Sequence, residues 1–215
     1  MKKFLIIFIF LFSLILPANA DVMPYYVNNI NTNSIGVYQA PKNIKIYKEP
    51  NENSTLLLNV NWDSTTFNCP DVSASNLFVV FLPKKELAFL TVIDENDGED
   101  WVQVIYNKNG TKTGWVKKDD ELRFMNWRTF FNIYGRKYGL YYMKDAPEES
   151  KSIYGSTADD AKPIGKITLA QTLKATSING LWVLIIAFDI DRSQKIGWIN
   201  WRSVSGEIYL FPDIK

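Results

Sequence analysis

The chain has 215 residues, of which 47% are hydrophobic and 22% charged, so it holds enough apolar side chains to build a packed core. Its 24 basic and 23 acidic residues leave no basic excess, which excludes the electrostatic footprint of a nucleic-acid binder. With no histidine and one cysteine, the chain has no Ser-His-Asp or Cys-His catalytic group, no histidine-bound zinc and no internal disulfide. We therefore expect neither a nucleic-acid partner nor a cofactor.

The first twenty residues have the pattern of a secretory signal peptide. Two lysines precede an apolar run from Phe4 to Leu16, and Ala18-Asn19-Ala20 matches a small-x-small cleavage site. The alternative is an uncleaved membrane anchor, but about thirteen residues at ~1.5 Å each fall short of the ~20 that span a bilayer. We expect residues 1–20 to be removed and the product to be exported, periplasmic or secreted, without a stable membrane span. Residues 21–34 are then an N-terminal extension.

A set of motifs occurs twice in the same order, which predicts a duplicated unit. Gly36-Val37-Tyr38-Gln39-Ala40-Pro41 is repeated in looser form as the segment from Gly139 to Pro147. In each copy an Ile-Tyr pair, an aliphatic residue, a Trp-Val strand and a Gly-Trp-aliphatic triplet follow. The matching residues are Ile46-Tyr47 and Ile153-Tyr154, Leu57 and Ile164, Trp101-Val102 and Trp182-Val183, and Gly114-Trp115-Val116 and Gly197-Trp198-Ile199.

The local pattern of each unit is that of β-strands. In the first unit, two runs rich in β-branched and aromatic residues flank Asn107-Lys108-Asn109-Gly110, whose Asn-Gly pair suits the positive φ of a tight hairpin. A longer polar loop joins the same two strands in the second unit, and the strand before them ends at Asn179-Gly180. Short strands with frequent turns predict a small barrel or sandwich. Strands are expected at 101–106, 112–116, 168–176, 181–188 and 195–199.

Helical signals are few. Residues 118–134 are the best candidate, with apolar residues at mixed spacing and Gly135 able to end the run, so we expect one or two short helical turns between the units. Asn126-Trp127 and Asn200-Trp201 predict a similar turn at the end of each unit. The first unit is the longer, and its extra residues are expected between Asn61 and Lys85, as a surface elaboration or a functional lid.

The order of these motifs resembles that of the bacterial SH3 domain (SH3b) family, whose first strand is followed by a Trp-x-x-Val strand and a Gly-Trp-Val strand. The arginine that usually follows the aliphatic residue of the first strand is replaced by Tyr47 and Tyr154. The resemblance implies an all-β protein with two tandem SH3-like small β-barrels, short helical turns between them and an insertion in the first. The segments that carry it are 44–50, 57, 101–104 and 114–116 in one copy and 151–156, 164, 182–185 and 197–199 in the other.

This interpretation predicts the domain boundaries. The first SH3-like domain is expected at 35–121, with its insertion near 61–85, and the second at 138–215, with a C-terminal strand. Residues 122–137 are the expected linker. Cys69 is predicted to be either a buried small side chain or a site of intermolecular pairing.

The resemblance implies a non-catalytic exported protein whose modules recognise peptidoglycan peptides or an envelope protein. Rigid aromatic side chains give such a barrel a large contact area at low entropic cost. Tryptophans at strand positions also fill barrel interiors, so each has a core-packing alternative. Tyr47 and Tyr154 adjoin polar loops and are expected to be partly exposed. The candidate ligand-binding residues are Tyr47, Trp101, Trp115, Tyr154, Trp182 and Trp198.

Two other functions remain open. The barrels could serve envelope assembly by docking another protein through an edge strand. A carboxylate-based wall glycosidase is less favoured, because no pair of carboxylates is marked by an apolar setting. The acidic run from Asp94 to Asp100 fails the EF-hand spacing, since Gly98 falls at position five and the distal Glu is missing, so we expect a solvated turn and no metal.

Overall fold

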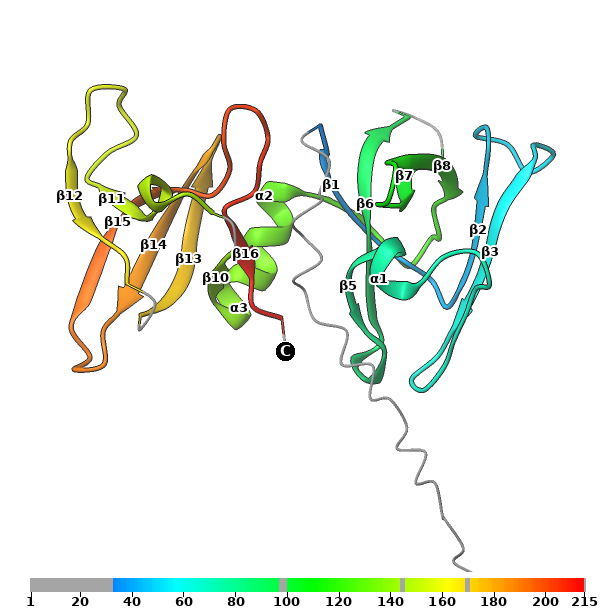
Figure 1. The fold of residues 1–215 in the computed structure, drawn as a ribbon, viewed down its shortest axis with the longest axis horizontal. Helices are drawn as coiled ribbons and strands as arrows, with labels where there is room; N and C mark the ends of the chain where they lie inside the picture. The colour runs from blue at the N-terminus through cyan, green and yellow to red at the C-terminus, as the bar shows by residue number, and fades with distance from the viewer. Residues whose placement is uncertain (1–32, 97–99, 144–145, 169–170, 215) are drawn as a thin grey trace, which may run out of the picture.

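A computed structural model describes residues 33–96, 100–143, 146–168 and 171–214 of the chain. Strands predominate, and they form two antiparallel sheets on either side of a short helical segment (Figure 1). The prediction of a mainly β protein is confirmed. The predicted signal peptide and nearly all of the predicted N-terminal extension lie outside the described residues.

Among the described residues, the first sheet contains β1 (Gly36–Gln39), β2 (Asn43–Tyr47), β3 (Leu56–Trp62), β4 (Phe67–Asn68), β5 (Phe78–Leu82), β6 (Leu87–Glu95), β7 (Trp101–Asn107), β8 (Lys112–Lys117) and β9 (Phe124–Asn126). The second contains β10 (Leu140–Tyr142), β11 (Ser152–Tyr154), β12 (Pro163–Lys166), β13 (Thr172–Asn179), β14 (Trp182–Phe188), β15 (Gln194–Asn200) and β16 (Leu210–Pro212). The helical elements are α1 (Ala74–Leu77), η2 (Pro83–Lys85), α2 (Trp127–Phe130), η3 (Phe131–Gly135), α3 (Arg136–Tyr138) and η4 (Glu148–Lys151).

The two sheets share one strand order once β4 and β5 are set aside. The first runs β3-β2-β8-β7-β6-β1-β9 and the second β12-β11-β15-β14-β13-β10-β16. Each sheet therefore contains a three-strand meander, flanked on one side by the unit's first and last strands and on the other by a hairpin. The repeated sequence motifs fall on repeated strands, which is the arrangement that a duplicated unit produces.

The predicted hairpins are present. In β7 and β8, Val102 lies opposite Val116 and Val104 opposite Gly114, and the turn between them places Gly110 at φ 87° and Thr111 at φ 51°. The turn therefore uses the positive φ predicted for Gly110, but the second residue with positive φ is Thr111 and not Asn109. The strand expected from residue 168 instead begins at Thr172, and it reaches the turn at Gly180, whose φ is 55°.

The described residues form two hydrophobic clusters. The first lies within the first sheet and is built from side chains that alternate along its strands, as period-2 packing requires, among them Ile44, Ile46 and Val104. The second fills the second sheet but extends further, because it also includes Phe130 of the helical segment and Phe89 of the first sheet. The two sheets are therefore joined through one continuous apolar cluster.

Aromatic rings at the centre of the second cluster connect both sheets to the helical segment. The Phe130 ring lies 5.4 Å from that of Phe89 and 5.5 Å from that of Phe211 in β16, and Phe131 lies 4.7 Å from Trp201. The indole Nε1 of Trp127 donates a 2.9 Å hydrogen bond to the carbonyl of Ser34. The expected linker thus supplies core side chains to the assembly.

The expected short helical turns between the units are present, but they occupy only the second half of the candidate run 118–134. Phe124 to Asn126 forms β9, because Met125 pairs with Val37 at the edge of the first sheet. The helical segment starts after Asn126, whose side chain accepts a hydrogen bond from the Thr129 amide, and it continues past Gly135 to α3. Gly139, with φ 89°, follows its last residue.

The extra residues of the first unit lie between β3 and β6. There the chain forms β4, α1, β5 and η2, whereas only residues 167–171 separate β12 from β13. The predicted added strand is present as β5 and pairs with β6, although Leu77 belongs to α1. Cys69 lies in this segment, half-buried and not in a disulfide. The segment is a built-in part of the first sheet.

The predicted equivalence of Asn126-Trp127 and Asn200-Trp201 is wrong. Asn126 ends β9, the last strand of its unit, while Asn200 ends β15, which β16 still follows. The two tryptophans instead meet across the second cluster, with ring centroids 6.1 Å apart.

Among the described residues, no helix is long and apolar enough to cross a membrane.

Lys108, in the β7–β8 turn, is buried in spite of its charge. It exposes 8% of its surface, and its Nζ donates hydrogen bonds to the carbonyl oxygens of Ser75 and Phe78, at 2.9 and 2.5 Å. Its amide donates to the Asn76 carbonyl at 3.1 Å. Burial lowers the pKa of Lys108 from 10.5 to about 7. These hydrogen bonds hold α1 against the end of β7.

Phe130→Ala should lower the free energy of unfolding by about 3–5 kcal/mol, since it removes a fully buried ring at the junction of both sheets. Urea denaturation followed by tryptophan fluorescence measures the change. Ile133→Ala on the same helical segment, where the side chain is exposed, is the control and should shift stability by less than about 0.5 kcal/mol. Equal effects of the two changes would contradict the shared core.

The stability contributed by Lys108 should depend on pH. The folded protein binds this proton less tightly than the unfolded chain, so the free energy of unfolding should rise between pH 7 and the unfolded pKa of 10.5, by at most about 1.4 kcal/mol per pH unit. Lys108→Met removes this titration. The difference in unfolding free energy between wild type and Lys108→Met should therefore move in favour of the wild type from pH 7 to pH 9. If this difference in unfolding free energy does not change with pH, Lys108 does not have a lowered pKa in the folded protein.

Candidate functional site

The six candidate aromatic residues form two equivalent clusters, one in each sheet. Tyr47 of β2 lies opposite Trp115 of β8, and its ring meets that of Trp101 edge-on, with centroids 5.7 Å apart. In the second sheet, Tyr154 lies opposite Trp198, and its ring meets that of Trp182 edge-on at 5.2 Å.

Both clusters lie on the outer face of their sheet. Successive side chains on a strand point to opposite faces, so Trp101 and Gln103 of β7 face away from the core residues Val102 and Val104. Directly paired residues share a face, which places Trp115 with Gln103. The tryptophans therefore do not fill the interior of the first sheet, and the same alternation holds for β14 and β15.

A close backbone approach holds each cluster together. A Cβ on Gly114 would lie 2.6 Å from the Ile46 side chain and 3.0 Å from the Tyr47 carbonyl oxygen. Gly197 stands in the same relation to Ile153 and Tyr154 in the second sheet. The glycine of the Gly-Trp motif is therefore needed for the strand carrying the tyrosine to reach the strand carrying the tryptophan.

The expected exposure of Tyr47 is wrong. Tyr47 exposes 9% of its surface and Trp101 exposes 8%, and the two rings contact each other edge-on across β8. Trp115 and all three aromatic residues of the second cluster are half-buried, and Tyr154 is thus partly exposed as predicted.

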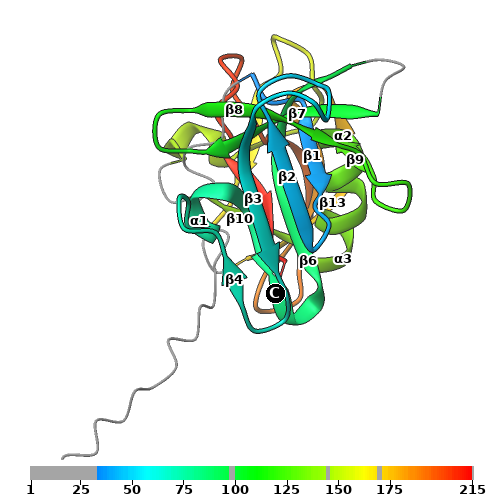
Figure 2. The same ribbon diagram turned by 90° about the vertical axis from the view of Figure 1, so that its right-hand side faces the viewer.

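A hollow of about 270 Å³ opens beside the first cluster, between β2 and β8. The described residues of these strands pair only at Tyr47 and Trp115, and the strands separate beyond that point. The amide of Lys118 donates to the backbone carbonyl of Asp100, just before β7, so the backbone groups of Lys117 point to the other side, towards β2. The apolar part of the lining comes from Ile44, Val116 and Tyr47. Figure 2 shows the β2–β3 hairpin standing in front of β8.

Charged groups of both signs surround this hollow. Lys117 Nζ donates to Glu52 Oε1 at 2.5 Å, which holds the pKa of Glu52 below and that of Lys117 above its ordinary value. Both side chains are more than half exposed, so the pair adds little stability. Lys45 and Asp119 complete the polar lining. The Asp119 amide donates to the Tyr38 hydroxyl at 2.7 Å, which links this part of the lining to β1.

The equivalent position in the second sheet is covered. There β11 is shorter, and the preceding helical turn η4 lies against β15. Ser150 of η4 is buried, and Lys151 pairs with Glu148 at 2.7 Å. A second hollow of about 270 Å³ occurs elsewhere, between β10 and β13, and is lined partly by Tyr138, Tyr141 and Tyr142. The two units have thus kept one strand order and diverged in their hollows.

Sequence reasoning found the aromatic residues but missed the hollow. The charged residues of its lining belong to no sequence motif, because they come together only where β2 and β8 separate. They are Lys45, Glu52, Lys117 and Asp119. The one available signal was the place of Lys117, two residues after the Trp of the Gly-Trp motif.

The described residues give no support to metal or carboxylate chemistry. No group of three or more potential metal ligands occurs among them, and residues 97–99 of the acidic run lie outside the description. Every described carboxyl group with a resolved shift has a lowered pKa, whereas a general acid needs a raised one.

Comparison with known proteins leaves the family open. No protein-family model matches the chain, and no curated protein matches its sequence.

Gly114→Ala should destabilise the protein by about 1–3 kcal/mol, because the new methyl group must push β2 away from β8. The displacement should also change the fluorescence of Trp101 and Trp115. Gly165→Ala in β12 is the control, since its nearest contact would be 3.7 Å from Ile153. Thermal unfolding and emission spectra test both, and the proposed strand contact fails if the two substitutions behave alike.

Proposed function

We propose that the protein is a non-catalytic exported binding protein, whose two units are SH3-like barrels and whose ligand is a cell-wall peptide or an extended segment of an envelope protein. The repeated order of a meander, a returning edge strand and a flanking hairpin supports duplicated small barrels. Export rests on the sequence pattern of residues 1–20 alone. The single observation that favours binding is the hollow between β2 and β8.

The hollow suits a short extended peptide. Its backbone groups at Lys117 offer the hydrogen bonds by which an added strand is held at an open sheet edge. Its volume of about 270 Å³ lies just below the range of drug-sized ligands, so it matches one or two residues of a peptide. Lysines and carboxylates in the lining complement a peptide that carries both carboxylates and amines, as peptidoglycan peptides do.

The aromatic cluster closes one end of this site. Trp115 is half-buried on the outer face and lies beside Tyr47, which lines the hollow. Half-buried aromatic side chains that are already held by their neighbours lose little entropy on binding. We propose the first cluster as the primary contact, and the second cluster as serving a different surface because η4 covers the equivalent hollow.

A role in envelope assembly is the alternative function. It would use edge strands rather than the hollow, and β12 is such an edge, with Ile164 exposed. Substitutions around the hollow separate the two functions.

Lys45→Glu should weaken binding to purified peptidoglycan sacculi at least tenfold, because it reverses an exposed charge of the lining without removing buried atoms. Trp115→Ala should have a similar or larger effect. Co-sedimentation of the chain starting at Asp21, over a range of sacculus concentrations, measures both.

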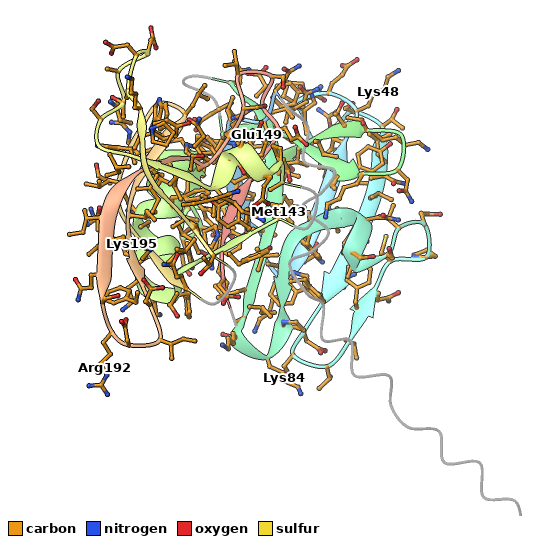
Figure 3. The ribbon with its side chains drawn as sticks, turned by 60° about the vertical axis from the view of Figure 1, so that its left-hand side comes forward. Lys48, Lys84, Met143, Glu149, Arg192 and Lys195 are labelled. Carbon is orange, nitrogen blue, oxygen red and sulfur yellow. The ribbon has the colours of Figure 1, made fainter. Side chains whose placement is uncertain are left out.

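The control for loss of an aromatic ring is Tyr209→Ala, at a half-buried residue outside the lining of the hollow, and Lys84→Glu controls for charge (Figure 3). Both should retain wild-type affinity for sacculi. If the wild type does not bind sacculi, a pull-down from envelope extract with the same variants tests a protein ligand. Binding that Lys45→Glu and Trp115→Ala leave intact in both assays rejects the hollow as the ligand site.

A further inference from the structure

The outer face of the second sheet carries a continuous apolar strip. Leu184 of β14 lies opposite Trp198 of β15, and the next outward pair is Ile186 opposite Ile196. Ile196 exposes 58% of its surface, and the other side chains are half-buried. Together with Trp182 and Tyr154 these residues cover parts of three adjacent strands.

The first sheet provides an internal comparison for this strip. Its β7–β8 hairpin has the same register, so the position of Leu184 corresponds to Gln103 and that of Ile196 to Thr113. One scaffold is therefore built with polar residues at these positions in one copy and apolar residues in the other. Folding of the hairpin does not require Leu184 and Ile196, and an exposed apolar strip marks an interaction surface.

Charges of opposite sign lie at the two ends of this face. At one end, around the β14–β15 turn, are Lys174, Arg192 and Lys195. Two carboxylates lie there too, but Asp189 is 3.7 Å from Lys195, and Asp191 accepts from the Ser193 amide within the turn. This end therefore carries a net charge of +1.

The other end of this face carries a net negative charge. The loop of residues 155–162 carries Asp159, Asp160 and Lys162, a net charge of −1. Figure 1 and Figure 3 show this loop and the β14–β15 turn at opposite ends of the sheet, with Arg192 projecting from the turn. A nucleic acid or an anionic lipid surface would favour cations at both ends.

We propose that this face is an interface between two copies of the chain, related by a twofold axis. A twofold operation lays the apolar strip of one copy on that of the other, because such an interface uses the same patch on both subunits. When the axis runs across the strands, it also brings the acidic end of each copy to the basic end of its partner. The interface is then apolar at its centre and charged at its rim.

The interface leaves the proposed ligand site free. The hollow belongs to the first sheet, on the other side of the helical segment, so a dimer would present two hollows. Two linked sites raise the apparent affinity for a repetitive polymer without any new contact. The dimer does not depend on this ligand, and its test does not use it.

Analytical ultracentrifugation of the chain starting at Asp21 tests the interface. The wild type should show a concentration-dependent monomer–dimer equilibrium. The double substitution Leu184→Gln and Ile196→Thr, which installs the residues of the first sheet, should weaken dimerisation at least tenfold and leave the circular dichroism spectrum unchanged. Val204→Thr, at an apolar residue exposed to 93% outside the strip, is the control and should dimerise as the wild type does.

A charge-reversal series tests the twofold arrangement. Asp159→Lys with Asp160→Lys should weaken the dimer by placing like charges together, and adding Arg192→Glu with Lys195→Glu should restore it. A wild type that stays monomeric up to 0.5 mM, or a dimer unaffected by the double apolar substitution, would overturn the proposal. Failure of the charge reversals to compensate would overturn the twofold pairing of the ends.

Discussion

The backbone carbonyl of Ser34 links the first sheet, the helical segment and the second sheet by hydrogen bonds. It accepts hydrogen bonds from Trp127 Nε1 at 2.9 Å and from Arg202 Nη1 at 3.1 Å, so the entry to the first sheet, the helical segment and the second sheet all meet there. Removing a buried carbonyl from water is costly unless its bonds are replaced. A relative movement of the two sheets would have to break these bonds and separate the Phe130 ring from Phe89 and Phe211, so these contacts oppose such a movement.

The shared core explains how the duplicated units could diverge. Because the central cluster fixes each sheet on its inner side, the outer faces and strand ends are free to change without loss of the fold. Between β2 and β8 this freedom left a polar hollow, and at the equivalent place a helical turn covers β15. On the outer face, the second sheet has Leu184 and Ile196 where the first has Gln103 and Thr113. Ligand binding and self-association are thus proposed for different copies of one unit.

Local features of the fold could be predicted from the sequence. Gly110 marked the position of its hairpin because glycine readily accepts positive φ, and the repeated Gly-Trp motif located equivalent strands. Features that depend on distant partners could not be predicted. Phe124 to Asn126 lies within a helix-like pattern, yet it becomes a strand because the edge of β1 is open to it. Tertiary pairing overrides such weak local preference.

The candidate site shows the same limit. The aromatic residues could be found because they recur in the sequence. The burial of Tyr47 could not be predicted, since it depends on the contact of its ring with that of Trp101 on another strand. The hollow depends on where β2 and β8 separate, and no sequence motif marks that point. The contact at Gly114 sets where β2 and β8 touch, and the Tyr38 hydroxyl of β1 holds Asp119, which lines the hollow. The surroundings of the hollow therefore depend on two contacts between segments far apart in the sequence, one at Gly114 and one at the Tyr38 hydroxyl.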